Sequence, residues 1–239
     1  MTKLVLNWKM NKPDVKISEY IEKLNEIKKD NDIEIILAPS FIQIPEISKN
    51  KDKINLSAQD ISKNEKGAFT GEISPLFLNE FDVDYVIIGH SERREFHGEY
   101  IEDIIDKAKN AINNKLKPII CLGETKEIYE KGKSQEHIIK EINLIKKHLK
   151  ESLGKIILAY EPVWAVGKNI NFSQDEYLHI KNNINILKSH TKSEVVYGGS
   201  VNLKNINNLI KHIPVDGFLL GGPSLDITAV NSIIEQMKG

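Results

Sequence analysis

Cysteine is almost absent from this sequence. Among the 239 residues there is one, Cys121, so the chain cannot form a disulfide bond within itself. This excludes the disulfide-stapled class of small secreted domains and favours a reducing compartment. Cys121 stands inside an apolar stretch, and we interpret it as a small buried hydrophobic side chain.

Long hydrophobic runs are also missing. No stretch approaches the ~20 apolar residues that a membrane-spanning helix requires. Near the N-terminus the apolar run ends at Asn7 and is too short for a secretory signal peptide. Together with the single cysteine, these features predict a cytoplasmic protein that makes no contact with membranes.

An excess of charge of either sign is missing as well. Lys and Arg number 33 and Asp and Glu number 34, which gives a formal net charge of −1. This balance offers no electrostatic basis for binding nucleic acid or an anionic membrane. A small anionic ligand would therefore have to be held by a few local groups.

Motifs for metals and cofactors are not found either. Apart from His90, the histidines stand on expected helices or surface loops without the spacing of metal ligands: His97, His137, His148, His179, His190 and His212. The segment that begins at Gly167 lacks the upstream glycine and the Ser or Thr of a phosphate-binding P-loop. We therefore predict no metal and no cofactor.

What the sequence does contain is a repeated alternation of two patterns. Short, almost continuously apolar runs, typical of parallel strands buried on both faces, occupy 4–8, 33–38, 54–58, 84–90, 117–123, 155–161, 193–199 and 215–222. Amphipathic stretches of helical period separate many of them, for example 17–27, 101–112 and 175–187. The alternation places this chain in the α/β class with parallel strands.

Eight strands alternating with helices in a chain of this length predict a closed (β/α)8 barrel, with residues 1–239 as a single domain. The alternative is an open, doubly wound sheet, which usually has fewer strands and a glycine-rich turn after the first. Here the first strand runs into NWKMNK, without glycine. The polar segment 59–71 is a long loop, and loops of this length are often functional.

Chemically reactive side chains stand where the expected strands end. Asn7 and Lys9 follow the first strand, His90 ends the fourth and Glu161 ends the sixth. Because the carboxyl ends of barrel strands meet at one face, we expect these side chains to converge. Pro162 keeps Glu161 extended, so that its carboxylate projects over the mouth of the barrel. The alternative that Glu161 only caps a turn or pairs with a lysine stays open.

Two glycine turns follow the last two strands. The seventh strand leads into Gly198, Gly199 and Ser200, and the eighth into Gly221 and Gly222. Glycine lets backbone N–H groups approach an anion closely, and phosphate sites in barrels of this kind lie after these strands. Pro223 would then suit the first position of a short helix. The alternative is that both are simply tight turns.

Several of these segments together resemble the triosephosphate isomerase family. In that family's order they are NWKMN (7–11), GAFTGEIS (67–74), IIGHSERR (87–94), CLGE (121–124), AYEPVWAVG (159–167), YGGSV (197–201) and DGFLLGG (216–222). The resemblance runs from the first strand to the last. It implies a TIM barrel and an intramolecular aldose–ketose isomerase of glycolysis and gluconeogenesis, which interconverts dihydroxyacetone phosphate and D-glyceraldehyde 3-phosphate through an enediolate.

The resemblance also implies roles for individual residues. Glu161 would be the base and His90, as neutral imidazole, the electrophile, while Asn7 and Lys9 would bind and polarise the substrate. Backbone N–H groups would hold its phosphate at Gly167, Ser200, Gly221 and Gly222. Supporting residues would be Ser91, Glu92, which pairs with Lys9 in the empty site, Trp164, which moves with a lid formed by 162–172, and Tyr197, which with Ser200 latches that lid.

The family further implies a homodimer, in which a loop docks near the partner's active site. The corresponding residues here are Phe69, Thr70, Gly71 and Glu72. The sequence departs from the family at the second lid hinge, where 168–170 reads KNI, and at Pro223, where a small residue is common.

Two other readings remain open at this stage. The chain could be a different barrel enzyme that acts on a small sugar phosphate, or a non-catalytic barrel that serves as a scaffold. The first should lack the pairing of HSE with EPVW, and the second should have lost Glu161, His90 or Lys9, yet all of these are present.

Overall fold

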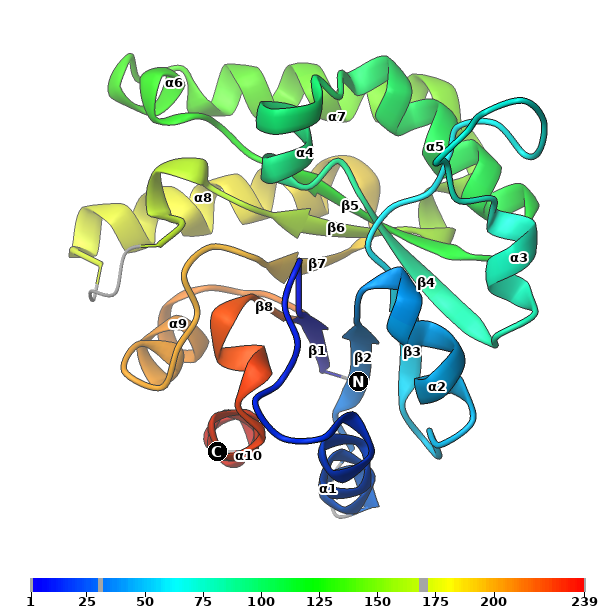
Figure 1. Cartoon of the computed structure of the whole chain (residues 1–239). Helices are drawn as coiled ribbons and strands as arrows, with labels where there is room; N and C mark the ends of the chain where they lie inside the picture. The colour runs from blue at the N-terminus through cyan, green and yellow to red at the C-terminus, as the bar shows by residue number, and fades with distance from the viewer. Residues whose placement is uncertain (1, 30–31, 168–171, 239) are drawn as a thin grey trace.

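The computed structural model describes residues 2–29, 32–167 and 172–238 and shows a closed barrel of parallel strands (Figure 1). Its strands follow one another around the barrel in chain order, β1 to β8, and β1 pairs with β8 to close it. The predicted (β/α)8 barrel is confirmed. The alternative of an open, doubly wound sheet is wrong, because a closed barrel has no edge strands and no reversal of strand order.

The strands are short and lie close to the predicted runs. They are β1 (Lys3–Asn7), β2 (Glu34–Ala38), β3 (Asn55–Ala58), β4 (Val83–Ile88), β5 (Lys117–Leu122), β6 (Ile157–Tyr160), β7 (Glu194–Tyr197) and β8 (Gly217–Leu220). The apolar runs predicted the strands well because each strand is buried on both faces, so that few positions carry polar side chains.

Helices cover the outside of the barrel. They are α1 (Ile17–Lys29), α2 (Ile44–Ser48), α3 (Pro75–Asn79), α4 (Ser91–His97), α5 (Ile101–Asn113), α6 (Lys126–Glu130), α7 (Ser134–Leu149), α8 (Gln174–Thr191), α9 (Ile206–His212) and α10 (Ile227–Met237). Short 3₁₀ helices are η1 (Phe41–Gln43), η2 (Lys150–Lys155), η3 (Val163–Ala165) and η4 (Gly222–Leu225). In Figure 1, α1 and α10 lie side by side at the bottom and α7 and α8 near the top. Within the described ranges, no helix is long and apolar enough to cross a membrane.

The hydrophobic core has two layers, because successive side chains of a strand point to opposite faces. On β1, Val5 joins the cluster inside the barrel, whereas Leu4 and Leu6 join the larger cluster between strands and helices. Cys121 lies in the inner cluster and is fully buried, as the sequence predicted. The same alternation of side chains determines whether a polar residue at the end of a strand points into the barrel or toward the helices. Asn7 continues the inner set of β1, and Trp8 packs in the outer cluster.

Charged side chains close the N-terminal end of the barrel. The ammonium of Lys3 lies 3.0 Å from Glu34 and 2.5 Å from Glu194, and Lys117 lies 2.9 Å from the other oxygen of Glu194. Burial opposes ionisation of Glu34, but hydrogen bonds from Tyr85 and Lys3 outweigh it and hold the pKa of Glu34 below its usual value. The pKa of Glu194 is lowered in the same way, by Lys3 and Lys117. The charged groups at the N-terminal end of the barrel therefore serve to stabilise the fold. Reactive groups are expected at the C-terminal end.

Candidate active site

A pocket of about 290 Å³ lies at the C-terminal ends of the strands. The residues that line it come from loops after five different strands and include these predicted site residues: Lys9, His90, Ser91, Glu161, Gly167, Ser200, Gly221 and Gly222. Side chains that are far apart in the sequence are thus brought together at one end of the barrel. This is the end at which barrel enzymes of this architecture carry their reacting groups.

Glu161 directly follows β6, and its carboxylate is only 3% exposed. Its backbone N–H donates to the carbonyl of Leu122 at 2.9 Å, which extends the barrel pairing by one residue and fixes the base of the side chain. Oε2 accepts a hydrogen bond of 3.2 Å from the N–H of Ser91, the first residue of α4. Oε1 lies 3.3 Å from Nε2 of His90, yet it has no aligned hydrogen bond within the described part of the chain.

These contacts bear on the two alternative roles considered for Glu161, capping a turn and pairing with a lysine. No lysine among the described residues pairs with it, and its contacts there are with His90 and Ser91. A capping contact is present, but it occupies only Oε2, whose partner is the N–H of Ser91. Oε1 stays beside the pocket, and no well-aligned donor reaches it from the described part of the chain. A buried carboxylate oxygen in this state is suited to accept a proton from a bound molecule.

Two small residues allow this placement of Glu161. A Cβ at Gly198 would lie 2.9 Å from Cγ of Glu161, so any larger residue there would displace the Glu161 side chain. On the opposite side, burial first and then the charge of Glu161 raise the pKa of the Cys121 thiol well above its usual value. Cys121 therefore keeps its proton and presents a neutral S–H group to the carboxylate.

His90 stands at the N-cap position of α4, and this contact determines which ring nitrogen carries the proton. Nδ1 accepts a hydrogen bond of 3.2 Å from the backbone N–H of Glu92, so it cannot itself bear a hydrogen. The neutral ring therefore carries its hydrogen on Nε2, the nitrogen next to Glu161. An Nε2–H group can donate a hydrogen bond to an oxygen atom in the pocket.

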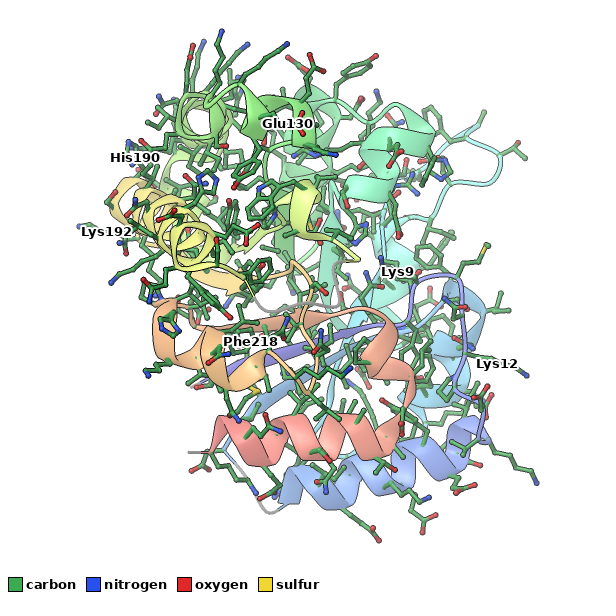
Figure 2. All side chains as sticks on the ribbon, turned by 90° about the vertical axis from the view of Figure 1, so that its left-hand side faces the viewer. Lys9, Lys12, Glu130, His190, Lys192 and Phe218 are labelled. Atoms are coloured by element: carbon green, nitrogen blue, oxygen red, sulfur yellow. The ribbon has the colours of Figure 1, made fainter. Side chains whose placement is uncertain are left out.

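Lys9 follows β1 in a left-handed backbone conformation with φ of 53°. A hydrogen bond of 3.0 Å from its own N–H to Oδ1 of Asn7 holds this strained turn. The ammonium lies 2.6 Å from Oε1 of Glu92, as predicted. In Figure 2, Lys9 lies toward the interior of the molecule, whereas Lys12 and Lys192 extend from its edges. The ion pair is half exposed and therefore weak, so an anionic substrate could replace Glu92.

Lys9 also lies against one of the glycine turns. A Cβ at Gly221 would come within 3.3 Å of Cε of Lys9, so a side chain there would push the lysine away. The second turn, Gly198 to Ser200, lines the same pocket from the other side, together with Gly167. The pocket therefore combines one ammonium with glycine-rich backbone at two places. Such backbone can turn its N–H groups toward an anion.

Trp164 does not line the pocket but anchors the segment that follows Glu161. Its ring is 6% exposed, and Nε1 donates a hydrogen bond of 2.7 Å to Oε1 of Glu124. The ring stacks on Tyr129 with centroids 4.2 Å apart and planes 15° apart. His179 also contacts Oε1 of Glu124, at 2.8 Å. Glu124, Tyr129 and His179 were not predicted as site residues. For Glu124 the sequence offered two signals, its place just after an apolar run and its membership of the CLGE segment.

Other predicted residues lie outside this pocket. Tyr197 ends β7, and its buried hydroxyl has no hydrogen-bond partner within the described ranges. Asn7 is 4% exposed and borders a neighbouring hollow of about 510 Å³, which Glu92 also lines. The predicted second hinge, 168–170, lies outside the described residues. After the segment predicted to be a lid, Ser173 and Glu176 exchange hydrogen bonds of 2.8 and 3.2 Å at the start of α8.

The predicted docking residues lie at the tip of the loop between β3 and α3. Phe69 is 45% exposed, and Thr70, Gly71 and Glu72 are exposed beside it. At the base of the loop, the N–H of Ser62 donates to the carbonyl of Ile73 at 2.8 Å. The loop is thus closed at its base and presents one exposed aromatic ring, that of Phe69, at its tip.

The geometry defines a class of protein first. Carboxylate and imidazole face each other at the carboxyl ends of parallel strands, which is the arrangement of (β/α)8-barrel enzymes that work by proton transfer. Comparison with known proteins then gives the family. The family model described as Triosephosphate isomerase matches residues 2–237, and the chain belongs to the triosephosphate isomerase family. It is therefore an isomerase.

Individual relatives agree with the family model. A triosephosphate isomerase from Mycoplasmopsis pulmonis is 40% identical over 252 residues, covering 98% of each chain. One from Mesomycoplasma hyopneumoniae is 41% identical over 236 residues, covering 95% of this chain and 96% of that protein. One from Wigglesworthia glossinidia brevipalpis is 38% identical, covering 98% and 97%.

Proposed function

We propose that this protein interconverts dihydroxyacetone phosphate and D-glyceraldehyde 3-phosphate through an enediolate, in glycolysis and gluconeogenesis. The observation that carries the proposal is the 3.3 Å approach of Glu161 Oε1 to His90 Nε2 beside a pocket with Lys9 and two glycine turns. Moving a carbonyl by one carbon requires a base for a C–H proton and a donor for the carbonyl oxygen. Family membership supports the same reaction.

In this proposal Glu161 removes the proton next to the carbonyl and returns it to the neighbouring carbon. His90 donates from Nε2 to the substrate oxygens and moves protons between them, while Lys9 and Asn7 bind and polarise the substrate. A positioned base typically supplies ~10²–10⁴-fold in rate, and one donor to a developing oxyanion about 3–4 kcal/mol. Neither alone is sufficient for a fast isomerase, so the reaction needs both.

The phosphate would be held by backbone N–H groups at Gly167, Ser200, Gly221 and Gly222. Residues 162–172 would close over it as a lid and exclude water, which protects the enediolate from losing phosphate. Closure would take the indole of Trp164 away from Glu124, and the hydroxyl of Tyr197, which has no hydrogen-bond partner in the described ranges, would latch the closed lid together with Ser200. Ser91 would hold Glu161 until the substrate binds.

We further propose a homodimer. Met10 and Phe96 are 95% and 70% exposed and border the 510 Å³ hollow beside Lys9. Large exposed apolar side chains around a hollow next to the active site are typical of a protein interface. The loop tip of a partner, with Phe69, Thr70, Gly71 and Glu72, would fill this hollow.

The remaining proposals concern organisation and location. Residues 1–239 would form one barrel domain, since strands from Lys3 to Leu220 belong to a single barrel. The enzyme would need no metal or cofactor and would work in the cytoplasm, without nucleic acid or membrane partners.

A coupled assay tests the proposed reaction. Purified protein is given D-glyceraldehyde 3-phosphate, and the dihydroxyacetone phosphate formed is reduced by a coupling dehydrogenase while NADH is followed. We expect rapid turnover that is absent in Glu161→Gln. Turnover of other sugar phosphates alone would instead favour a different barrel isomerase, and lack of activity on any of them would favour a scaffold.

A further inference from the structure

The 3₁₀ turn η4, which begins at Gly222, is hydrogen-bonded to strand β1, which ends at Asn7 and leads into Lys9. The residue that makes this connection is Ser224, which is fully buried. Its carbonyl accepts hydrogen bonds from the hydroxyl of Tyr20 at 2.5 Å and from Nε1 of Trp8 at 3.2 Å. Its own hydroxyl donates to the carbonyl of Asn7 at 3.2 Å. Strand β1, helix α1 and turn η4 therefore meet at one residue.

These contacts fix the orientation of the turn as well as its place. A carbonyl oxygen has two lone pairs, and Tyr20 and Trp8 occupy both of those on Ser224. The N–H of Ser224 donates to the carbonyl of Gly221 at 2.8 Å, so Ser224 also closes the turn onto the glycine beside Lys9. Rotation of this peptide group would break several buried hydrogen bonds at once.

Tyr20 reaches Ser224 from α1, outside the barrel. Its ring is fully buried and meets the ring of Trp8 edge to face, with centroids 5.1 Å apart. Its hydroxyl can only donate here, because the Ser224 oxygen has no hydrogen to offer. Burial raises the pKa of Tyr20, so the hydroxyl remains protonated at any pH at which the enzyme would work.

We propose that Tyr20 is a positioning residue for phosphate binding. It holds the Gly221–Gly222 turn at a fixed place relative to Asn7 and Lys9, which would contact the reacting end of the same substrate. This inference rests on the proposed function, because it requires that the turn binds the substrate phosphate. Tyr20 does not line the pocket, and its hydroxyl acts through Ser224.

The test is Tyr20→Phe, which keeps the ring packing and removes only the hydroxyl. We expect the KM for D-glyceraldehyde 3-phosphate and the Ki of inorganic phosphate to rise together by about fivefold, the effect of losing one typical buried hydrogen bond. Because the reacting groups are not moved, kcat should stay within about twofold of the wild type. Ser224→Ala, which breaks the bond to Asn7, should shift KM and Ki in the same direction.

The matched control is Tyr85→Phe. Tyr85 also donates from a buried hydroxyl, to Glu34, but at the N-terminal end of the barrel. We expect this variant to unfold at a lower temperature while KM and Ki keep their wild-type values. Equal changes of KM and Ki in both variants, or unchanged KM and Ki in Tyr20→Phe, would overturn the positioning role while the proposed function stands. A wild-type protein without isomerase activity or phosphate competition would overturn both.

Discussion

Oε1 of Glu161 lies 3.3 Å from Nε2 of His90, although one residue follows β6 and the other follows β4. The carboxylate is held by its backbone and by the N–H of Ser91, and the imidazole is held by the first turn of α4. Hydrogen bonds thus fix one polar atom of each group, Oε2 of Glu161 and Nδ1 of His90. The other polar atom of each, Oε1 and Nε2, lies on the side of the pocket. Fixed reacting groups keep the geometry of proton transfer without reorganisation when substrate binds.

Shortening the proposed base by one methylene should slow the reaction. Glu161→Asp retracts the carboxylate by about 1 Å, and a misplacement of that size can cost ~10²-fold in kcat. KM should change little, because the phosphate contacts remain. The measurement is steady-state kinetics in the coupled assay. Glu22→Asp, at an exposed position of α1, is the matched control and should behave as wild type. A kcat in Glu161→Asp equal to that of the wild type would refute the role of Glu161.

Removing the ammonium of Lys9 should affect activity far more than stability. In Lys9→Met the developing charge of the enediolate loses one donor, worth about 3–4 kcal/mol, so kcat/KM should fall at least ~10²-fold. The side chains of Lys9 and Glu92 are 27% and 45% exposed, and such pairs contribute about 0–1 kcal/mol to folding. The wild type and Lys9→Met should therefore unfold at nearly the same temperature. A large loss of stability with normal activity would contradict this assignment.

Inorganic phosphate should inhibit by competing with the substrate. Both would occupy the glycine turns at Gly198–Ser200 and Gly221–Gly222, so phosphate should raise the apparent KM and leave kcat unchanged. Initial rates at several phosphate concentrations and constant ionic strength give the pattern. Sodium chloride at matched ionic strength is the control for general screening. Inhibition that lowers kcat, or none, would place the phosphate site elsewhere.

Charge placed on the exposed apolar face should disrupt the proposed dimer. We expect the wild type to have the mass of two chains and Phe96→Glu to shift toward one chain, because a charged side chain is costly in a buried interface. Light scattering coupled to size exclusion gives the masses. Leu178→Glu is the control, since Leu178 is 54% exposed on α8 and does not border the hollow. A wild type that is monomeric and fully active at nanomolar concentration would rule the dimer out.

The charges at the N-terminal end of the barrel predict a pH dependence of stability. The lowered pKa values of Glu34 and Glu194 mean that their contribution is present above about pH 4.5 and is lost as pH falls through their folded-state pKa values. The raised pKa of Lys3 means that its contribution is present below pH 10.5 and is lost as pH rises above that value. The cluster should thus be most stabilising between these limits.

Lys3→Met tests this assignment. The variant leaves two carboxylates near each other, and removal of one partner of a buried pair costs about 3–5 kcal/mol. Because the Glu194 side chain is 38% exposed and keeps its contact with Lys117, we expect less than this, about 2 kcal/mol at pH 7. Below pH 4 the destabilisation should become smaller, since protonation removes the repulsion. Urea unfolding at both pH values measures it, and a penalty that grows in acid would contradict the prediction.

Much of the fold could be predicted from the sequence because barrel strands are buried on both faces. Runs such as 117–123 contain almost no polar residue, and β5 occupies Lys117–Leu122. The convergence of Lys9, His90 and Glu161 was also predictable, since parallel strands in a closed barrel all end at the same face. These inferences need only the order of the strands and their direction.

Contacts between buried polar groups were not predictable in this way. Nothing in the local sequence indicates that Trp164 and His179 share the carboxylate of Glu124, or that Tyr20 donates to Ser224. Each pair joins elements that are distant along the chain, and many donors could in principle have served. The partner of a buried hydrogen-bonding group depends on which side chains the packing brings within reach.

The sequence by itself determined the strands, their parallel order and which residues stand at their carboxyl ends, because apolar periodicity and chain direction are local properties. The tertiary structure alone decided that one oxygen of Glu161 accepts from Ser91 while the other lies beside His90, and that η4 is hydrogen-bonded to β1 through Ser224. Hydrogen bonds require partners within about 3 Å and in line, and this geometry exists only after the elements have packed.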